Sequence, residues 1–327
     1  MKKNYLSHFS QILRTSFLCF TLSLFALVQS NAHTLPAVKL FASAIEGRWN
    51  LTINEDGKEK PAWLEVKHSG LKTLVGYFVA SSGSARPVSK VNFTTDKFSF
   101  SIPPQWEMGA GDLTVEGTVI GPNNISGTII MPDGKKHSFT GVRAPSLQRT
   151  AEPVWGAPIT LFNGKDLKGW KADGPNQWVA DAGILRNPKA GSNLMTEQTF
   201  NDFKLHVEFR YPKGSNSGVY LRGRYEVQVA DSKGSGAAYD QLGAVYGFLV
   251  PTEMVAKEPG EWQTYDITLT GRMITVIANG KMIICNAEIP GITGGAIDSK
   301  ESDPGPIMFQ GDHGVVEFRN IILTPAK

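Results

Sequence analysis

The chain has 327 residues, with 33 lysines and arginines against 30 aspartates and glutamates, and a formal net charge of +3 at pH 7. Such a balance produces no long-range field for nucleic acid or anionic membranes, so we expect neither as a partner. The two cysteines, Cys19 and Cys285, exclude a disulfide framework and a cysteine-rich zinc site. Stability must therefore come from burial of apolar side chains, in one large domain or two ordinary ones.

Residues 1–32 are predicted to be a signal peptide. Basic residues precede the apolar run 15–28, which has the length of a signal-peptide core and is too short to span a bilayer comfortably. Residues 30–32 (Ser-Asn-Ala) form a small-x-small cleavage site, so the mature chain starts near His33 with 30 basic and 30 acidic residues. The residues before Cys19 favour soluble export over a lipid anchor. We expect an exported bacterial protein, periplasmic or secreted, with no membrane span.

Short alternating runs separated by turn residues predict an all-β architecture throughout the mature chain. A first domain is expected at residues 43–145, as a small barrel or sandwich. It opens on Gly47-Arg48-Trp49, which resembles the start of lipocalin-type barrels, although a tryptophan in a first strand is usually a core residue. Its strand candidates are the runs 48–53, 62–68, 74–80, 97–103, 113–120, 125–131 and 137–143.

Residues 146–157 contain proline and lack alternation, which is typical of a linker. A second all-β domain is expected at residues 158–327. Asn279-Gly280 lies between two alternating runs and predicts a two-residue hairpin turn. The strand candidates of this domain are 159–163, 178–187, 203–211, 217–229, 261–271, 273–279, 281–289, 305–310 and 315–323.

The run 217–229 alternates most regularly and is predicted to form one strand. Successive side chains of a strand point to opposite faces, so its odd-numbered apolar residues are expected to join the core. The opposite face then presents Tyr220, Arg222, Arg224, Glu226 and Gln228. This row suits a hydroxyl-rich ligand such as a sugar. It is also the pattern of a solvated sheet face with cross-strand charge pairs.

Several motifs follow one another in the second domain: LFNGKDL (161–167), GW (169–170), NSGVYLRG (216–223), YEVQV (225–229), GAVYG (243–247), EWQTY (261–265), NG (279–280), GPIMFQ (305–310), HG (313–314) and FRNI (318–321). In this order they resemble the 3-keto-disaccharide hydrolase family over residues 155–327. The resemblance implies a concanavalin A-like jelly roll, made of two antiparallel sheets of which one is concave. The first domain is similar to the leader domain that some members carry.

Laminarinase-type enzymes on the same jelly roll carry their acids as Glu-x-Asp-x-x-Glu on one strand. The comparable run here is EVQVAD, residues 226–231, in which an amide replaces the middle acid. The last position of the motif is occupied by Asp231 in place of a glutamate. The run therefore argues against a standard retaining mechanism with two carboxylates.

The chemistry that the resemblance implies is cleavage of 3-keto-glycosides. A ketone at C3 makes the C2 hydrogen acidic; a base removes it, the C1 group is eliminated, and water adds back. This route needs a base, an electrophile and a proton donor. Glu226 is the candidate base, His313 the candidate acid–base group, and Arg222 and Arg224 the candidates for stabilising an enediolate. The candidates for binding substrate hydroxyls are Asn216, Tyr220, Gln228, Tyr246 and Gln310.

Other interpretations stay open at this point. A divalent metal ion held by Glu226 and His313 would act as a Lewis acid, but two ligands far apart in sequence are weak support for a metal site. His313 is equally typical of an ordinary loop residue. A non-catalytic carbohydrate-binding module is the main alternative, because the same jelly roll also serves lectins. An interaction protein of a cell-surface complex, with the first domain as adaptor, is a third.

Overall fold

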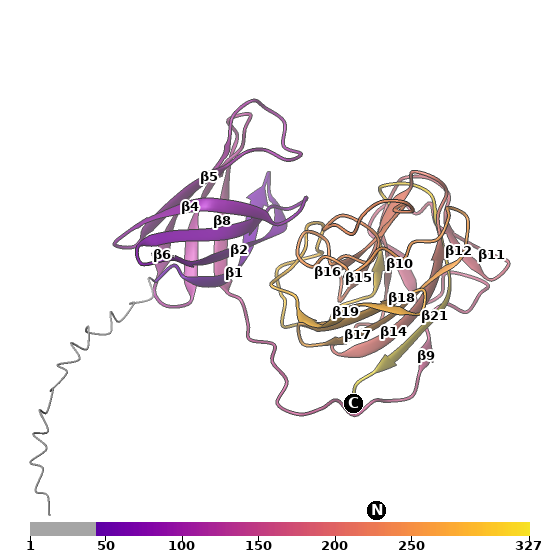
Figure 1. The fold of residues 1–327 in the computed structure, drawn as a ribbon. Helices are drawn as coiled ribbons and strands as arrows, with labels where there is room; N and C mark the ends of the chain where they lie inside the picture. The colour runs from indigo at the N-terminus through magenta and orange to yellow at the C-terminus, as the bar shows by residue number, and fades with distance from the viewer. Residues whose placement is uncertain (1–43) are drawn as a thin grey trace, which may run out of the picture. The chain divides into compact units, whose positions relative to one another are not determined.

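The computed structural model describes residues 44–327, and the signal peptide predicted at 1–32 lies outside them. Every regular element in the described part is a β-strand, so the all-β prediction is confirmed. The strands form a closed barrel and, further along the chain, a two-sheet sandwich, both within one compact unit (Figure 1). The described residues contain no helix with the length and apolar character of a membrane span.

The barrel has eight antiparallel strands, closed by the pairing of β1 with β8. Only seven strands were predicted, because Pro87 and a register shift in the pairing with β3 interrupt the alternation of β4. Apolar side chains such as Trp49, Phe78 and Phe100 fill the interior. The strands are β1 (Gly47–Glu55), β2 (Lys58–Ser69), β3 (Thr73–Val79), β4 (Arg86–Thr94), β5 (Lys97–Ile102), β6 (Leu113–Ile120), β7 (Asn124–Ile130) and β8 (Lys136–Arg143).

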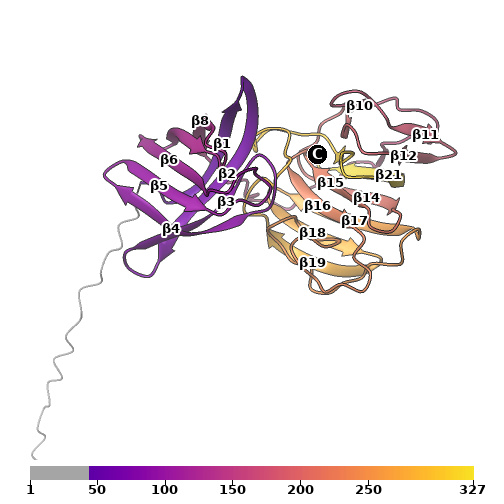
Figure 2. The ribbon, with the colours of Figure 1, turned by 90° about the horizontal axis from the view of Figure 1, so that it is seen from above.

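The sandwich consists of a five-stranded sheet, ordered β10-β13-β20-β15-β16, and a larger sheet, ordered β11-β12-β21-β14-β17-β18-β19 with β9 paired to β21 (Figure 2). This arrangement confirms the two antiparallel sheets implied by the resemblance. The strands are β9 (Ile159–Thr160), β10 (Trp170–Ala172), β11 (Val179–Asp181), β12 (Ile184–Asn187), β13 (Leu194–Thr196), β14 (Phe203–Arg210), β15 (Asn216–Leu221), β16 (Tyr225–Ala230), β17 (Gln263–Thr270), β18 (Met273–Ala278), β19 (Lys281–Glu288), β20 (Met308–Phe309) and β21 (Val316–Pro325).

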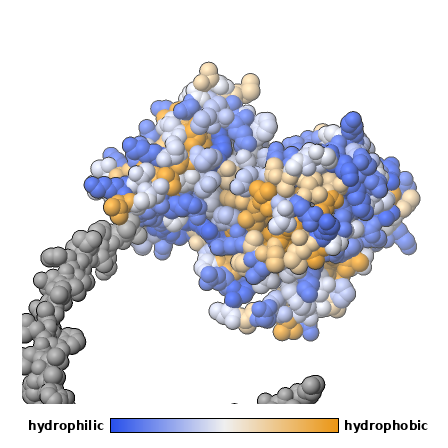
Figure 3. Space-filling model, viewed as in Figure 1, coloured by the Kyte–Doolittle hydropathy of each residue, from blue (hydrophilic) through white to orange (hydrophobic). Residues whose placement is uncertain are grey.

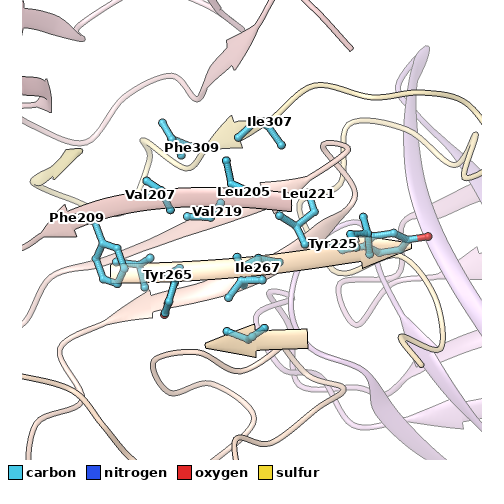
Figure 4. Close-up of a cluster of buried hydrophobic side chains, with 14 of the residues drawn as sticks. Leu205, Val207, Phe209, Val219, Leu221, Tyr225, Tyr265, Ile267, Ile307 and Phe309 are labelled. Atoms are coloured by element: carbon cyan, nitrogen blue, oxygen red, sulfur yellow. The ribbon is translucent and has the colours of Figure 1, made fainter. Parts of the chain in front are cut away.

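Apolar side chains from both sheets meet between them (Figure 4). Val219, Leu221 and Tyr225 come from the five-stranded sheet, and Val207 and Tyr265 from the larger one; none of the five is measurably exposed. Burying a side chain of this size stabilises the fold by roughly 1.5–3 kcal/mol. The odd-numbered residues of β15 and β16 therefore face inward, as predicted, and their even-numbered neighbours face away from this core.

The run 217–229 is a hairpin, which makes the prediction of one long strand wrong. Strand β15 ends at Leu221 and β16 begins at Tyr225, and the turn places Arg222 and Gly223 at φ angles of 52° and 64°. These left-handed angles turn the chain back, so Tyr220 lies opposite Glu226 across the two strands. The hairpin predicted at Asn279-Gly280 is confirmed, with φ angles of 50° and 80° between β18 and β19.

The surface seen in Figure 3 is largely hydrophilic, with hydrophobic residues gathered in patches. Scattered apolar residues are normal on soluble proteins. Two large side chains of the loop between β5 and β6 are unusually exposed, Trp106 at 68% and Met108 at 82%.

Candidate active site

A cavity of about 470 Å³ lies over the outward side chains of β15 and β16. Its volume falls within the range of small-molecule sites. All the site residues predicted from the sequence line it except the two arginines: Asn216, Tyr220, Glu226, Gln228, Tyr246, Gln310 and His313. These residues come from two sheet strands and two loops and thus converge on one hollow.

Arg222 and Arg224 are not brought to this cavity, because the turn between β15 and β16 carries them away from the outward face. Arg222 is fully buried and donates from Nη2 to the Tyr225 hydroxyl and to the carbonyl oxygen of Gly271, both at 2.9 Å. Arg224 binds the Asp298 carboxylate with two N–H groups, at 2.7 and 3.1 Å. Both guanidiniums brace loops around the turn, and neither faces the position of a substrate.

Glu226 is the most perturbed acid of the cavity. It is only 4% exposed, and this burial raises the pKa of its carboxyl from 4.5 to about 8, with smaller opposing effects from Tyr220 and His313. No cationic side chain pairs with it among the described residues. The Tyr220 hydroxyl lies 2.9 Å from Oε2 of Glu226 and 2.9 Å from the carbonyl oxygen of Gly294, so its single proton is shared between two acceptors.

A glycine makes room for this carboxyl group. Gly218 lies opposite Gln228 in the hairpin, and a Cβ atom built on it would meet Oε1 of Glu226 at 2.4 Å. Any larger residue would therefore push the carboxyl out of its place. The absence of a side chain at Gly218 fixes where the acid can lie.

The loop after β16 returns along the free side of that strand. The backbone N–H of Tyr246 donates to the carbonyl oxygen of Glu226 at 3.0 Å, and the N–H of Gln228 donates to that of Ala244 at 2.9 Å. Val245 forms a β-bridge with Val227. This pairing holds the Tyr246 side chain over the cavity and fixes the backbone of Glu226.

His313 lies in the loop between β20 and β21 and is half exposed, with 45% of its side chain in solvent. Its Nδ1 is 2.5 Å from the Asp312 carboxylate, and this hydrogen bond raises the pKa of the imidazole above its usual 6.5. His313 and Glu226 also attract each other electrostatically when both are charged. An imidazole whose protonated form is favoured and a buried carboxyl thus line the same cavity.

Three amide side chains leave acceptors unused. Oδ1 of Asn216 and Oε1 of Gln228 and Gln310 are buried without a hydrogen-bond partner among residues 44–327. Leaving a buried acceptor unsatisfied costs about 1–3 kcal/mol, so such groups normally await a ligand or water. Amides both donate and accept, which suits them to sugar hydroxyls.

The described residues contain no group of three or more His, Cys, Asp and Glu side chains arranged for a metal ion. A cation held by Glu226 and His313 would have to draw further ligands from the neighbouring amide oxygens, which Ca²⁺ and Mg²⁺ accept. The metal hypothesis stays a prediction that chelation tests.

Sequence reasoning missed several lining residues. Asp312 could have been found from its place beside His313, since a carboxylate next to an imidazole commonly orients it. Trp106, Ser82 and Gly83 line the cavity from barrel loops, where no periodic pattern marks them. A larger hollow of about 580 Å³ lies near Trp63. Its one acidic lining residue, Glu65, pairs with Arg48 at 3.0 Å and with Lys67 at 3.7 Å, so this hollow lacks an acid like Glu226.

Comparison with known proteins gives matches over the sandwich. Residues 157–324 match the family described as 3-keto-alpha-glucoside-1,2-lyase-like domain. A 3-keto-disaccharide hydrolase of Bacteroides thetaiotaomicron is 29% identical over 90 residues, which are 24% of this chain and 31% of that protein. The match thus spans about a third of the curated relative's length.

Two solved structures from Parabacteroides distasonis, which carry a provisional glycosyl hydrolase name, also resemble the chain. One is 29% identical, with a TM-score of 0.45, and the match covers 55% of this chain and 96% of that one. The other is 28% identical, with a TM-score of 0.43, and the match covers 51% and 98% respectively.

Proposed function

Because the chain belongs to the 3-keto-alpha-glucoside-1,2-lyase-like domain family, we propose that it cleaves 3-keto-glycosides, such as 3-keto-disaccharides or 3-keto-glucosides. The name of the Bacteroides relative supports the substrate class. The observation that carries the proposal is Glu226. Within residues 44–327 this buried carboxyl forms no ion pair, its pKa is raised to about 8, and its cavity is lined with unused hydrogen-bonding groups.

The first step is removal of the C2 proton. The Glu226 carboxylate takes this proton, and the electrons of the C2–H bond move into an enediolate across C2 and C3. A carboxylate with a raised pKa is a stronger base than an ordinary one, and its proton affinity near neutral pH suits both uptake and return of a proton. The amide N–H groups of Asn216 and Gln310 would donate hydrogen bonds to the developing oxyanion. These amides would then stabilise the enediolate, the role predicted from the sequence for the two arginines.

The second step is elimination at C1. The enediolate electrons form the C1–C2 double bond while the C1–O bond breaks, and protonated His313 supplies a proton to the leaving oxygen. Neutral His313 then takes a proton from water as the water oxygen adds to C1, the proton held by Glu226 returns to C2, and the 3-keto-sugar is released. The net reaction is hydrolysis. Asp312 keeps His313 protonated through the hydrogen bond that raises its pKa.

Export to the periplasm or the medium is part of the proposal. It rests on the basic and apolar pattern of residues 1–32 and its small-residue cleavage site. A test is whether the full-length protein, produced in a bacterial host, is recovered outside the cytoplasm with its N-terminus near His33. A protein retained in the cytoplasm with Met1 in place would contradict it.

The activity is tested by incubating the purified protein with 3-keto-trehalose or an aryl 3-keto-glucoside and following the released sugar or aglycone. Unoxidised trehalose is the matched control, because without the ketone its C2 hydrogen is not acidic. The assay is repeated with EDTA: lost activity restored by a divalent ion would support the metal hypothesis. Tight sugar binding with no cleavage would favour the carbohydrate-binding module instead.

A further inference from the structure

A side chain of the barrel reaches the candidate active site. Trp106, in the loop between β5 and β6, lines the same cavity as Glu226, together with Ser82 and Gly83 from the loop between β3 and β4. Trp106 is nevertheless 68% exposed, so most of its indole surface contacts no other side chain. An indole offers a large flat apolar face with a single polar atom, a combination typical of ligand-binding surfaces.

The loop that carries Trp106 is held by a nearly buried ion pair. Arg86 donates to both oxygens of the Glu107 carboxylate, at 3.2 and 2.7 Å, and the two side chains are only 11% and 10% exposed. The same carboxylate accepts from the backbone N–H groups of Gln105, at 2.7 Å, and Trp106, at 3.1 Å. The tryptophan backbone is thus fixed before any ligand arrives, which lowers the entropy lost on binding.

Contacts at the cavity orient the indole. The Tyr246 side chain lines the same cavity as the indole. A Cβ atom built on Gly83 would lie 3.0 Å from Cδ1 of Trp106, so the ring edge packs closely on that glycine. With one edge packed against Gly83 and most of the residue exposed, the indole leaves its faces for a ligand.

The barrel loop and the sandwich loop meet through their backbones. The N–H of Gly295 donates to the carbonyl oxygen of Ser81 at 3.1 Å. A Cβ atom on Gly294 would lie 2.2 Å from the carbonyl oxygen of Gly83, an approach that only glycine permits. Gly294 and Gly295 line the cavity as well, so the barrel supplies one of its walls.

We propose that Trp106 forms a stacking subsite for the sugar ring that leaves from C1, and that the barrel thereby selects 3-keto-disaccharides over 3-keto-glucosides with small aglycones. The C–H groups on one face of a pyranose ring form a flat apolar surface, and its hydroxyls point to the rim. That surface matches the indole face, while the keto-sugar itself binds the amides around Glu226. The inference rests on the proposed function.

The test compares Trp106→Ala and Trp106→Phe with the wild type on two substrates, 3-keto-trehalose and methyl 3-keto-glucoside. The quantity of interest is the ratio of kcat/KM for the disaccharide to kcat/KM for the methyl glycoside. We expect Trp106→Ala to lower this ratio roughly tenfold, mainly through KM for the disaccharide, and Trp106→Phe to restore part of it. Met108→Ala is the control, since Met108 shares the loop and is 82% exposed but does not line this cavity.

An unchanged ratio in Trp106→Ala, or an equal fall in Met108→Ala, would overturn the stacking subsite while leaving the proposed function intact. If the wild type cleaves neither substrate, the proposed function fails, and the subsite is then judged by calorimetric titration with 3-keto-trehalose. Binding that weakens roughly tenfold in Trp106→Ala, but not in Met108→Ala, would uphold the subsite in that case. Equal binding by all variants, or no binding by the wild type, would overturn it.

Discussion

Two buried glutamates of the chain have opposite surroundings. Glu301 is 1% exposed; Arg272 donates to both of its oxygens at 2.7 and 2.5 Å, the Tyr225 hydroxyl donates at 2.6 Å, and Asn50 of the barrel donates at 3.1 Å. Glu226 is 4% exposed and has only the shared proton of Tyr220. A carboxylate whose oxygens accept many hydrogen bonds, such as that of Glu301, joins parts of the fold. A carboxylate that accepts few, such as that of Glu226, keeps its affinity for protons.

The surroundings of the two glutamates indicate a structural role for Glu301 and a chemical role for Glu226. Both acids occur on or near the hairpin turn that carries Arg222, yet the cations of this region serve Glu301 and its neighbours rather than Glu226. A carboxylate beside a guanidinium would stay ionised at neutral pH and be a weak base. Keeping the arginines away from the cavity is therefore consistent with a base of raised pKa.

The largest effect is expected from Glu226→Gln. It removes the proton acceptor but keeps the size and burial of the side chain, so kcat for a 3-keto-glycoside should fall roughly 10²–10⁴-fold. Affinity for 3-keto-trehalose, measured by calorimetry, should be largely retained. A variant with nearly wild-type turnover would remove Glu226 from the mechanism and erase the distinction between the two glutamates.

Glu301→Gln should show the converse behaviour. Removing one partner of a buried pair leaves Arg272 uncompensated, which typically costs about 3–5 kcal/mol. We expect a correspondingly lower free energy of unfolding in urea, with kcat close to wild type for the protein that remains folded. An unchanged unfolding midpoint would mean that the Glu301 contacts do not stabilise the fold.

Gly218→Ala is expected to damage the site and spare the fold. The added Cβ would meet Oε1 of Glu226 at 2.4 Å and displace the base, and a displacement of about 1 Å can cost roughly 100-fold in rate. Gly236→Ala is the matched control, because a Cβ there meets nothing within 4 Å. Equal kcat values in the two variants would show that the position of the carboxyl group is not critical.

The smallest effect concerns pH. The pKa of Glu226 is about 8 in the folded protein and near 4.5 when unfolded, so the folded state holds one more proton between these values. This group therefore makes the protein less stable as pH rises from about 4.5 to about 8, and kcat/KM should rise over the upper part of the same range as the base ionises. Glu226→Gln should flatten this contribution to the stability profile, measured by urea unfolding at several pH values; an unaltered profile would contradict the raised pKa.

Part of the candidate site was predictable because the side chains of β15 and β16 keep the same alternation between the two faces on both sides of the hairpin turn. In the observed register Tyr220 lies opposite Glu226 and Gly218 opposite Gln228, so the even-numbered residues share a face on both strands. The prediction of one strand therefore grouped these residues correctly despite the wrong topology. It failed for Arg222 and Arg224, since residues in a turn do not follow the alternation of the strands beside them.

Other features could not have been predicted from a single sequence. Glu301 and Trp106 lie in loops without periodicity. Asn50, which binds Glu301, and Tyr246, which lines the cavity with Trp106, are far away in the chain. The pKa of Glu226 depends on burial produced by several segments at once, which no local pattern contains. Fold class follows from short-range alternation, whereas the chemistry of a site depends on long-range contacts.

The segment that pairs with β16 has a second consequence, for solubility. Strand β16 lies at the end of the five-stranded sheet, where unpaired backbone groups would invite another chain to add a strand. The N–H groups of Gly243 and Tyr246 and the bridge of Val245 occupy that margin. One short stretch thus shields the sheet from self-association while it presents Tyr246 to the cavity, so changes that loosen it should cause aggregation and loss of turnover together.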